Sequence, residues 1–234
     1  MNRRRSGVAS AVATILRSGT DLVVPTICGG CDTPGVPWCP ECAATLADAP
    51  IRLDPRIELP VDAWALGRYR GPYRRSLVAV KEHDRRDLTR PLGRALAGAV
   101  VTLGRWGEIP DGETLTLIPA PTRRSSARRR GGDPVAAMSR VAAGRLGPRV
   151  SSLDLLVTSS RARDSVGLDA RRRVDNLSGA IRLRHRWTDP GPATGGAVLL
   201  VDDILTTGAT SAESVRVLAR HGVTVHAVVV VAGA

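Results

Sequence analysis

The sequence predicts an α/β protein in which a parallel sheet flanked by helices follows a small cysteine-rich segment. From residue 114 onward, strands that are apolar throughout alternate with helical segments, which is typical of a parallel sheet covered on both faces. Four cysteines lie close together near the N-terminus. The 234 residues are 43% hydrophobic and 24% charged, which argues against a disordered chain, a collagen-like repeat or a small disulfide-stapled protein.

The first segment, residues 6–18, is predicted to be an amphipathic helix, because apolar residues from Val8 to Leu16 recur at helical spacing. Three arginines precede this run as in a signal peptide, but Arg17 ends it and no small-residue cleavage site follows. No stretch reaches the ~18 apolar residues that span a membrane. We therefore expect a cytoplasmic protein that does not insert into membranes.

The chain is expected to divide into residues 1–49, a proline-rich linker at 50–60 and one larger domain at 61–234. Asp133 and Pro134 have the helix-start chemistry of an N-cap and a first-turn proline. Strands are predicted at 64–69, 114–118, 153–157, 180–183, 197–201 and 223–231. Helices are predicted at 74–82, 88–103, 133–146 and 168–176, with one more that ends at His221.

The four cysteines, Cys28, Cys31, Cys39 and Cys42, have the spacing C-x2-C-x7-C-x2-C. Each pair forms a knuckle that aims two sulfurs at one point, and two knuckles supply the four thiolates of a tetrahedral zinc site. Two disulfides are disfavoured without a secretion signal, and an iron–sulfur cluster is the other metal alternative. The spacing predicts a structural zinc ion, because four thiolates leave no open position for catalysis.

The chain is strongly basic, with a formal net charge of +12. Lys81 is the only lysine among the 34 basic residues, and phenylalanine is absent. This bias is typical of a GC-rich genome, whereas clustered arginines also suit phosphates because their planar fork binds two oxygens. Two interpretations stay open, namely codon bias and an anion-binding surface for phosphate or nucleic acid.

An acidic pair and a threonine-rich loop follow the apolar strand 197–201. Asp202 and Asp203 come at its carboxyl end, where open α/β sheets bind their ligands. Both can point the same way only if the strand has ended, so we expect the chain to turn at about Asp202. The capping-box spacing of Thr210 and Glu213 predicts where the next helix begins. We interpret the loop as a phosphate cradle and the carboxylates as ligands of sugar hydroxyls. The cradle residues are Thr206, Thr207, Gly208, Ala209 and Thr210.

This segment closely resembles the phosphoribosyl pyrophosphate (PRPP) signature of type I phosphoribosyltransferases. Together with the cysteines, it makes the chain similar to the ComF (competence protein F) family. The resemblance extends to Tyr69–Gly71 with the later Lys81, to Ile118–Pro121 with Arg130-Gly131, and to Arg171–Ala180. The chain departs from the family where Gly132-Asp133 replaces Phe-Asn and where the region of Asp164-Ser165 replaces a glutamine.

The resemblance implies a type I phosphoribosyltransferase-like fold that binds PRPP, or another phosphoribosylated small molecule, together with Mg²⁺. It implies catalytic roles for Asp202 and Asp203 and a pyrophosphate loop after the strand at 114–118. Arginine suits a diphosphate, and the loop is assigned to Ala120, Arg123, Arg124 and Arg130. The resemblance also implies a link to competence and DNA uptake, with single-stranded DNA or DNA-processing proteins as partners.

Three functions stay open. A phosphoribosyltransferase would let an acceptor attack C1 of PRPP through an oxocarbenium-like centre, while Mg²⁺ and arginine neutralise the departing pyrophosphate. A non-catalytic accessory protein of DNA uptake or repair would use the same fold as a scaffold for nucleic acid. A PRPP-sensing regulator would bind the ligand without turnover. The fold class alone does not separate these functions, and neither the acceptor base nor the oligomeric state has a sequence signature.

Overall fold

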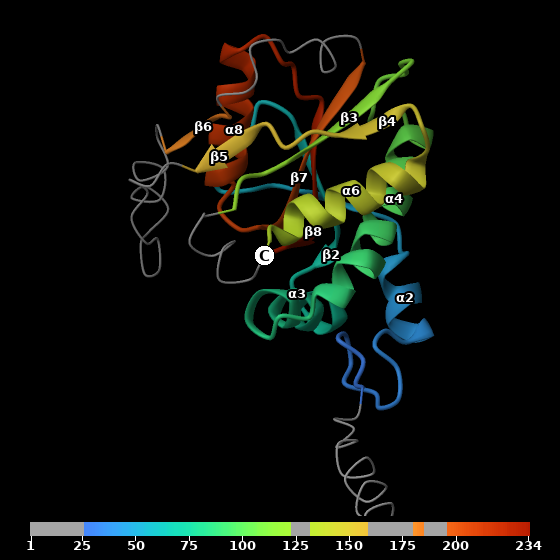
Figure 1. Cartoon of the computed structure of the whole chain (residues 1–234). Coiled ribbons are helices and arrows are strands. Elements are labelled where there is room, and N and C mark those ends of the chain that lie inside the picture. The colour runs from blue at the N-terminus through green and yellow to red at the C-terminus, as the bar shows by residue number, and fades with distance from the viewer. Residues whose placement is uncertain (1–25, 123–131, 159–179, 185–195) are drawn as a thin grey trace, which may run out of the picture.

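A six-stranded sheet forms the centre of the molecule (Figure 1). The computed structural model describes residues 26–122, 132–158, 180–184 and 196–234. The strand order is β1-β2-β8-β7-β3-β4, and every neighbouring pair is parallel except β1 with β2. The expected α/β class with a mostly parallel sheet is therefore confirmed. The strands are β1 (Ile51–Leu53), β2 (Asp62–Arg68), β3 (Leu115–Pro119), β4 (Val150–Ser152), β7 (Ala197–Leu205) and β8 (Ala227–Gly233).

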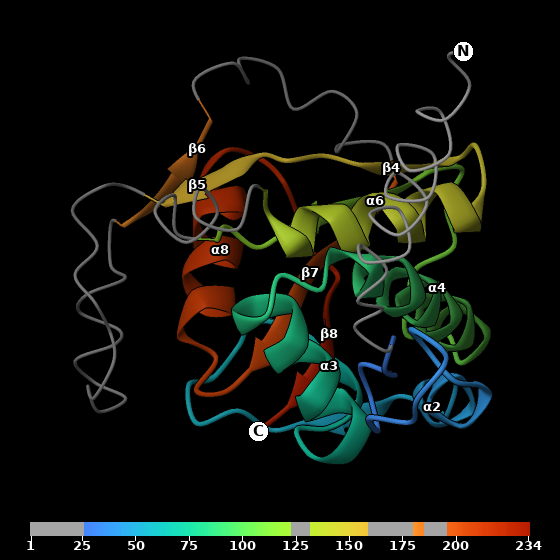
Figure 2. The same cartoon turned by 60° about the horizontal axis from the view of Figure 1, so that its bottom comes forward.

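Helices cover both faces of this sheet (Figure 2). On one face α3, α4 and α6 pack on β7 and β8, and on the other face α8 packs on the same strands. All of β8 and the first five residues of β7 are buried, as expected for strands covered on both faces. The helices are α2 (Pro40–Leu46), α3 (Gly71–Glu82), α4 (Thr89–Arg105), α6 (Pro134–Leu146) and α8 (Ala209–Arg220), with a 3₁₀ turn η1 (Arg86–Leu88) before α4.

Helix α6 begins where the sequence predicts it. The Asp133 carboxylate accepts hydrogen bonds from the N–H groups of Val135 (2.9 Å) and Ala136 (3.2 Å), and Pro134 is the first helical residue. The start of α6 is thereby fixed near the end of β3, which is the strand that precedes it in the chain.

Two predicted strands take a different place from the one expected. The segments 153–157 and 180–183 form β5 (Leu156–Thr158) and β6 (Ile181–Leu183), which pair antiparallel in a separate two-stranded sheet. They stay out of the main sheet because β4 already pairs with the free edge of β3. The pair instead packs over the α8 side of the core.

The segment 50–60, predicted to be a linker, contains strand β1. Ile51 and Leu53 alternate with Arg52, so the two apolar side chains pack inward while Arg52 forms an ion pair with Asp62 on β2. This short alternation is surrounded by prolines in the sequence, which explains why its strand character was missed. The last strand also differs slightly, because it begins at residue 227 rather than at 223.

Some expectations concern residues outside those described, namely the helices at 6–18 and 168–176 and the whole of the loop 123–130. Within the described ranges, no helix is both long enough and apolar enough to cross a membrane.

Candidate functional site

The four cysteines lie together in the segment 26–47, here called the cysteine module. Their Sγ atoms are all within 4.8 Å of one another, with 3.7 Å between Cys28 and Cys42 and 3.5 Å between Cys31 and Cys39. Four sulfurs placed 2.3 Å from one ion at tetrahedral angles are about 3.8 Å apart. The cluster is therefore compatible with a structural zinc site, as the cysteine spacing predicts.

Backbone N–H groups of the module donate hydrogen bonds to these sulfurs. The Cys39 N–H donates to Cys28 Sγ (3.3 Å), and the Cys42 N–H donates to Cys39 Sγ (3.4 Å) because Cys39 is the N-cap of α2. A Cβ at Gly30 would lie 2.6 Å from Cys42 Sγ, so any side chain there would enter the cluster. Such surrounding hydrogen bonds orient metal ligands and tune their affinity.

The thiols differ in how readily they lose their protons. The Thr33 hydroxyl lies 3.0 Å from Cys31 Sγ and lowers the pKa of Cys31 to about 6, whereas burial raises the pKa of Cys42. Metal binding requires deprotonated thiols and releases their protons. The environment of Cys31 thus favours its thiolate, whereas burial disfavours the thiolate of Cys42.

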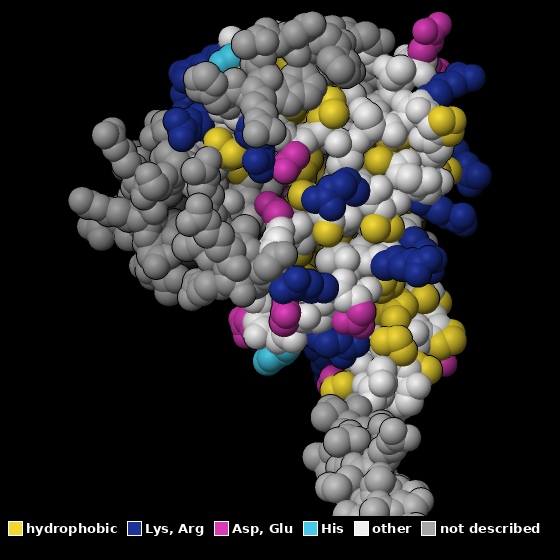
Figure 3. All heavy atoms as spheres, viewed as in Figure 1, with side chains coloured by type: hydrophobic (Ala, Val, Ile, Leu, Met, Phe, Trp, Pro, Cys, Tyr) yellow, Lys and Arg dark blue, Asp and Glu magenta, His cyan; other side chains and the backbone are white. Residues whose placement is uncertain are grey.

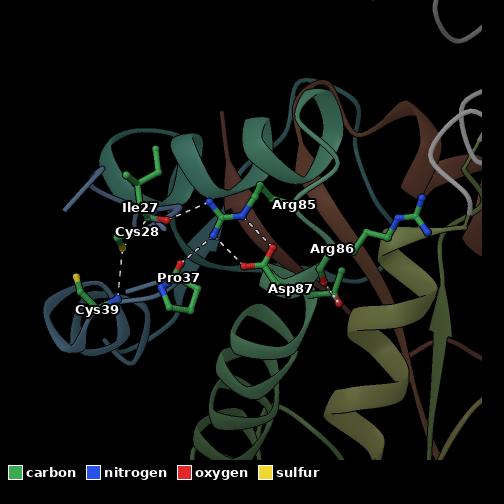
Figure 4. A network of polar contacts seen from close by, with 9 residues as sticks. Ile27, Cys28, Pro37, Cys39, Arg85, Arg86 and Asp87 are labelled. Atoms are coloured by element: carbon green, nitrogen blue, oxygen red, sulfur yellow. Dashed lines mark hydrogen bonds and ion pairs between the residues drawn. The ribbon is translucent and has the colours of Figure 1, made fainter. Parts of the chain in front are cut away.

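Arg85 ties the cysteine module to the α/β core (Figure 4). Its guanidinium donates to the carbonyl oxygens of Ile27 (3.0 Å) and Pro37 (3.2 Å), which lie in two separate parts of the module, and pairs with Asp87 at 2.8 Å. Sequence reasoning missed Arg85, because nothing local separates it from the neighbouring Arg86.

The carboxyl ends of β2, β3, β7 and β8 lie at one edge of the sheet, here called the carboxyl edge, because these strands run parallel. The chain leaves this edge through residues 69–71 after β2, 120–122 after β3 and 206–208 after β7. Parallel α/β sheets bind their ligands at this edge. Candidate residues that are distant in the sequence are therefore neighbours in the structure.

Asp202 and Asp203 lie inside β7, so the expected turn at Asp202 is wrong. Pairing with β3 ends at Val201, but pairing with β8 continues to Leu205, and the chain bends only from Thr206. The continued ladder with β8 keeps this stretch extended. Successive residues of a strand point to opposite faces, and the two carboxylates accordingly have different environments.

Asp203 pairs with Lys81 of α3, whose Nζ lies 2.8 Å from Asp203 Oδ2. Asp202 Oδ1 accepts a hydrogen bond from the Asp203 N–H at 2.8 Å. Burial, and next the negative charge of Asp203, raise the pKa of Asp202 to about 8, against the opposing effects of that N–H and of Lys81. The charged form of Asp202 is therefore disfavoured, whereas Asp203 has Lys81 as its ion-pair partner.

The loop after β7 packs against residues 55–57. Gly208 has a φ of +88°, in the left-handed region, and a Cβ there would lie 3.1 Å from the carbonyl oxygen of Ile57 and from Pro55 Cβ. The Ile57 N–H also donates to the Thr207 carbonyl oxygen at 3.0 Å. Sequence reasoning missed this contact, because it joins segments some 150 residues apart in the chain.

Helix α8 begins at Ala209, so Thr210 lies in its first turn and the prediction that it caps the helix is wrong. Gly208 is the N-cap, because its left-handed conformation turns the chain into the helix before Thr210 is reached. Thr207 Oγ1 accepts a hydrogen bond from the Ala209 N–H at 3.4 Å. The side chain of Glu213 pairs with Arg216. The predicted cradle 206–210 thus consists of a three-residue loop and the first turn of a helix.

Ala120 lies at the carboxyl edge beside β7, and its N–H donates to the Val201 carbonyl oxygen at 2.7 Å. Thr122 Oγ1 donates to Asp133 Oδ1 at 3.0 Å and so links the two ends of the loop between β3 and α6. Thr122 has no signal of its own in the sequence. The other predicted residues of this loop, Arg123, Arg124 and Arg130, lie outside the described residues.

A cavity of about 280 Å³ opens between the C-terminal end of α3 and the N-terminal end of α6. Its lining includes Val80, which precedes Lys81, and Asp133, whose charge contributes to the raised pKa of Asp202. Arg86 also lines it, and Figure 4 shows this side chain extending toward the start of α6. This cavity therefore adjoins the start of α6, and neither Asp202 nor Asp203 is among its lining residues.

A larger cavity of about 640 Å³ lies between the cysteine module and α3. Ile27, Pro37 and Val78 give it an apolar wall, and Arg74 and Arg75 add positive charge. It includes none of the residues predicted to bind a phosphate or a sugar.

The structure thus brings Lys81, Ala120, Asp202, Asp203 and the cradle 206–210 to one edge, and it places the four cysteines in a separate module. Each site is defined by its own geometry and chemistry. No protein-family model matches this chain, and no curated protein matches it either.

Proposed function

We propose that the carboxyl edge binds a phosphorylated ribose, with PRPP as the candidate ligand. The observation that carries this proposal is one continuous segment, in which the acidic end of β7 runs through the loop 206–208 into the N-terminus of α8. N–H groups and the positive end of a helix favour a phosphate, while carboxylates accept hydrogen bonds from hydroxyls. One segment would therefore hold the 5-phosphate and the ribose hydroxyls together.

The diphosphate of PRPP would lie toward the loop that follows β3 and begins at Ala120. Mg²⁺ would enter with the diphosphate, because proteins bind this ion largely through substrate phosphates. Its charge would stabilise pyrophosphate as a leaving group. The arginines of the loop, Arg123, Arg124 and Arg130, are proposed to add to this neutralisation.

On the same grounds we propose that the chain is a type I phosphoribosyltransferase-like protein of the ComF family. The parallel sheet, its helices on both faces, the acidic carboxyl edge and the N-terminal cysteine module all support this assignment. The proposed activity is transfer of a phosphoribosyl group to an acceptor, in a protein linked to DNA uptake or nucleotide metabolism.

We also infer that Cys28, Cys31, Cys39 and Cys42 bind one structural zinc ion. The donor set fits, because four thiols converge and backbone N–H groups point at their sulfurs. The ion would supply folding free energy to a module that has little apolar core of its own.

A second candidate function, nucleic-acid handling without catalysis, is favoured by α4 and α6. These two helices contain five arginines and no acidic residue, and Figure 3 shows basic side chains on this side of the molecule. No ion pair joins any of the five to another described residue. Such a surface attracts a phosphate backbone. The five are Arg90, Arg94, Arg105, Arg140 and Arg145.

Calorimetric titration of the zinc-loaded protein with PRPP and Mg²⁺ tests the first proposal. Hydrogen bonds to charged groups contribute about 1.5–3 kcal/mol, so replacing both Asp202 and Asp203 by Asn is expected to weaken binding about ten- to hundredfold. Asp62→Asn is the matched control, because Asp62 forms an exposed ion pair with Arg52 at the amino end of β2, at the opposite edge of the sheet.

The outcomes separate the functions. Binding followed by pyrophosphate release with one of a panel of bases supports the enzyme, and binding without release supports a PRPP-sensing regulator. Absence of PRPP binding, together with single-stranded DNA binding that weakens steeply with salt, supports the accessory protein. Normal PRPP binding by the double Asn variant would place the ligand elsewhere.

A further inference from the structure

The segment 54–61, which joins β1 to β2, passes beside the start of α8 (Figure 2). It contacts the loop 206–208 through its main chain. The Ile57 N–H donates a hydrogen bond to the Thr207 carbonyl oxygen at 3.0 Å, and the Ile57 carbonyl oxygen lies 3.1 Å from the place that a Cβ of Gly208 would take. The loop is therefore held by backbone groups of Ile57.

This hydrogen bond fixes the direction of the peptide group between Thr207 and Gly208. A trans peptide group is planar, so its C=O and its N–H point in opposite directions. Because the Thr207 C=O points at Ile57, the Gly208 N–H points away from the segment 54–61. The direction of the Gly208 N–H thus depends on a residue that is distant in the sequence.

The Gly208 N–H is not used by the protein itself. Within the described part of the chain it forms no hydrogen bond, although Gly208 is buried. The same holds for the N–H groups of Thr210 and Ser211 in the first turn of α8, which has no side-chain cap. The Ala209 N–H, by contrast, donates to Thr207 Oγ1. Buried N–H groups without any partner are rare in native proteins, and water or a ligand normally pairs with those that the protein leaves open.

We propose that Ile57 is a positioning residue for the 5-phosphate of the ligand. Its backbone N–H holds the Thr207 carbonyl oxygen and thereby directs the Gly208 N–H, together with the N-terminus of α8, toward the phosphate. The inference rests on the proposed function of the carboxyl edge. Ile57 acts through the Thr207–Gly208 peptide group without touching the ligand, and no covalent bond is made or broken.

Calorimetry on the zinc-loaded full chain tests the proposal with two probes, ribose 5-phosphate and pyrophosphate with Mg²⁺. Ile57→Pro removes the N–H donor. Losing a well-directed hydrogen bond to a charged phosphate should weaken the binding of ribose 5-phosphate about tenfold or more. The binding of pyrophosphate, which is proposed to lie at the loop after β3, should stay unchanged. An equal loss for both probes would indicate a general structural defect and would overturn the positioning role.

Two further variants separate the N–H from other effects of the substitution. Ile57→Ala keeps the N–H and shortens the side chain, so it should retain the binding of ribose 5-phosphate even if it unfolds at a lower temperature. Glu58→Pro is the matched control, because Glu58 is exposed and its N–H forms no hydrogen bond with another described residue. A loss in Ile57→Ala equal to that in Ile57→Pro would assign the effect to the side chain and would overturn the proposal.

A second measurement needs no variant. In ¹H–¹⁵N NMR spectra of the wild type, ribose 5-phosphate should move the Gly208 amide proton to lower field, as a new hydrogen bond to phosphate does, and pyrophosphate should leave it in place. An unmoved Gly208 signal in a protein that binds ribose 5-phosphate overturns this inference and leaves the proposed function standing. A wild type that binds neither ribose 5-phosphate nor PRPP overturns the proposed function and this inference with it.

Discussion

The cysteine module and the carboxyl edge are built in opposite ways. The module takes its four thiols from one short segment, and its own backbone N–H groups orient them. The carboxyl edge takes Lys81, Ala120, Asp202 and Gly208 from distant parts of the chain, and the parallel sheet holds them together. We therefore expect the folded structure of the cysteine module to depend on a bound metal ion. The folded structure of the carboxyl edge should depend instead on the packing of the hydrophobic core.

The largest effect expected from this difference concerns a cysteine ligand. Cys28→Ser should abolish stoichiometric zinc binding and unfold residues 26–47, because structural zinc sites contribute about 10–16 kcal/mol of apparent binding free energy that depends on the complete ligand set. Elemental analysis gives zinc per chain, and hydrogen exchange locates the unfolding.

Thr33→Val is the control for this experiment, because Thr33 contacts Cys31 Sγ but is not a ligand. It should retain one zinc ion per chain. If Cys28→Ser exposed β7 and β8 as well as the module, the two regions would not be independent.

Arg85→Ala tests how the module is held to the core. Its removal leaves the carbonyl oxygens of Ile27 and Pro37 without a charged donor, and we expect a loss of about 1.5–3 kcal/mol in the free energy of unfolding of the module. Urea unfolding followed by Trp38, which packs against the cysteines, measures this loss.

Arg75→Ala is the matched comparison, because its ion pair with Asp32 also joins α3 to the module but is exposed. Exposed pairs contribute about 0–1 kcal/mol, so its effect should be the smaller one. Equal effects of the two variants would show that Arg85 is not the anchor.

Gly208, at the carboxyl edge, and Gly98, inside α4, should respond in opposite ways to substitution by alanine. Gly208→Ala should destabilise the protein by about 1–2 kcal/mol, because a left-handed backbone is costly for alanine and the Cβ would press on Ile57 and Pro55. Gly98→Ala should stabilise it by about 0.5–1 kcal/mol, because Gly98 is helical and a Cβ there meets nothing within 4 Å. Thermal unfolding should therefore shift in opposite directions, and a shared direction would contradict the tight contact at Gly208.

The sequence predicted the features that depend on residues close together in the chain. The cysteine cluster follows from spacing within one segment, and α6 follows from the local N-cap chemistry of Asp133. The central strands β7 and β8 follow from uninterrupted apolar runs, which only a sheet covered on both faces can bury.

The remaining features depend on contacts between distant segments. The length of β7 beyond Asp202 depends on pairing with β8, and the shape of the loop at Gly208 depends on residues 55–57. Local patterns contain no information on either contact. Lys81 was suggested only by the resemblance to a family. Arg85 was not predicted at all, because nothing in the local sequence distinguishes an arginine that binds backbone carbonyls of the module from one that is exposed to solvent.

The most direct test of the central claim is hydrogen exchange with mass spectrometry on the zinc-loaded protein, alone, with PRPP and Mg²⁺, and with a zinc chelator. We predict that PRPP slows exchange in 206–210 and 119–122 and leaves 26–47 unchanged. The chelator should accelerate exchange in 26–47 and leave β7 and β8 protected. Protection by PRPP in the cysteine module, or none at the carboxyl edge, would contradict the assignment of the phosphoribosyl site.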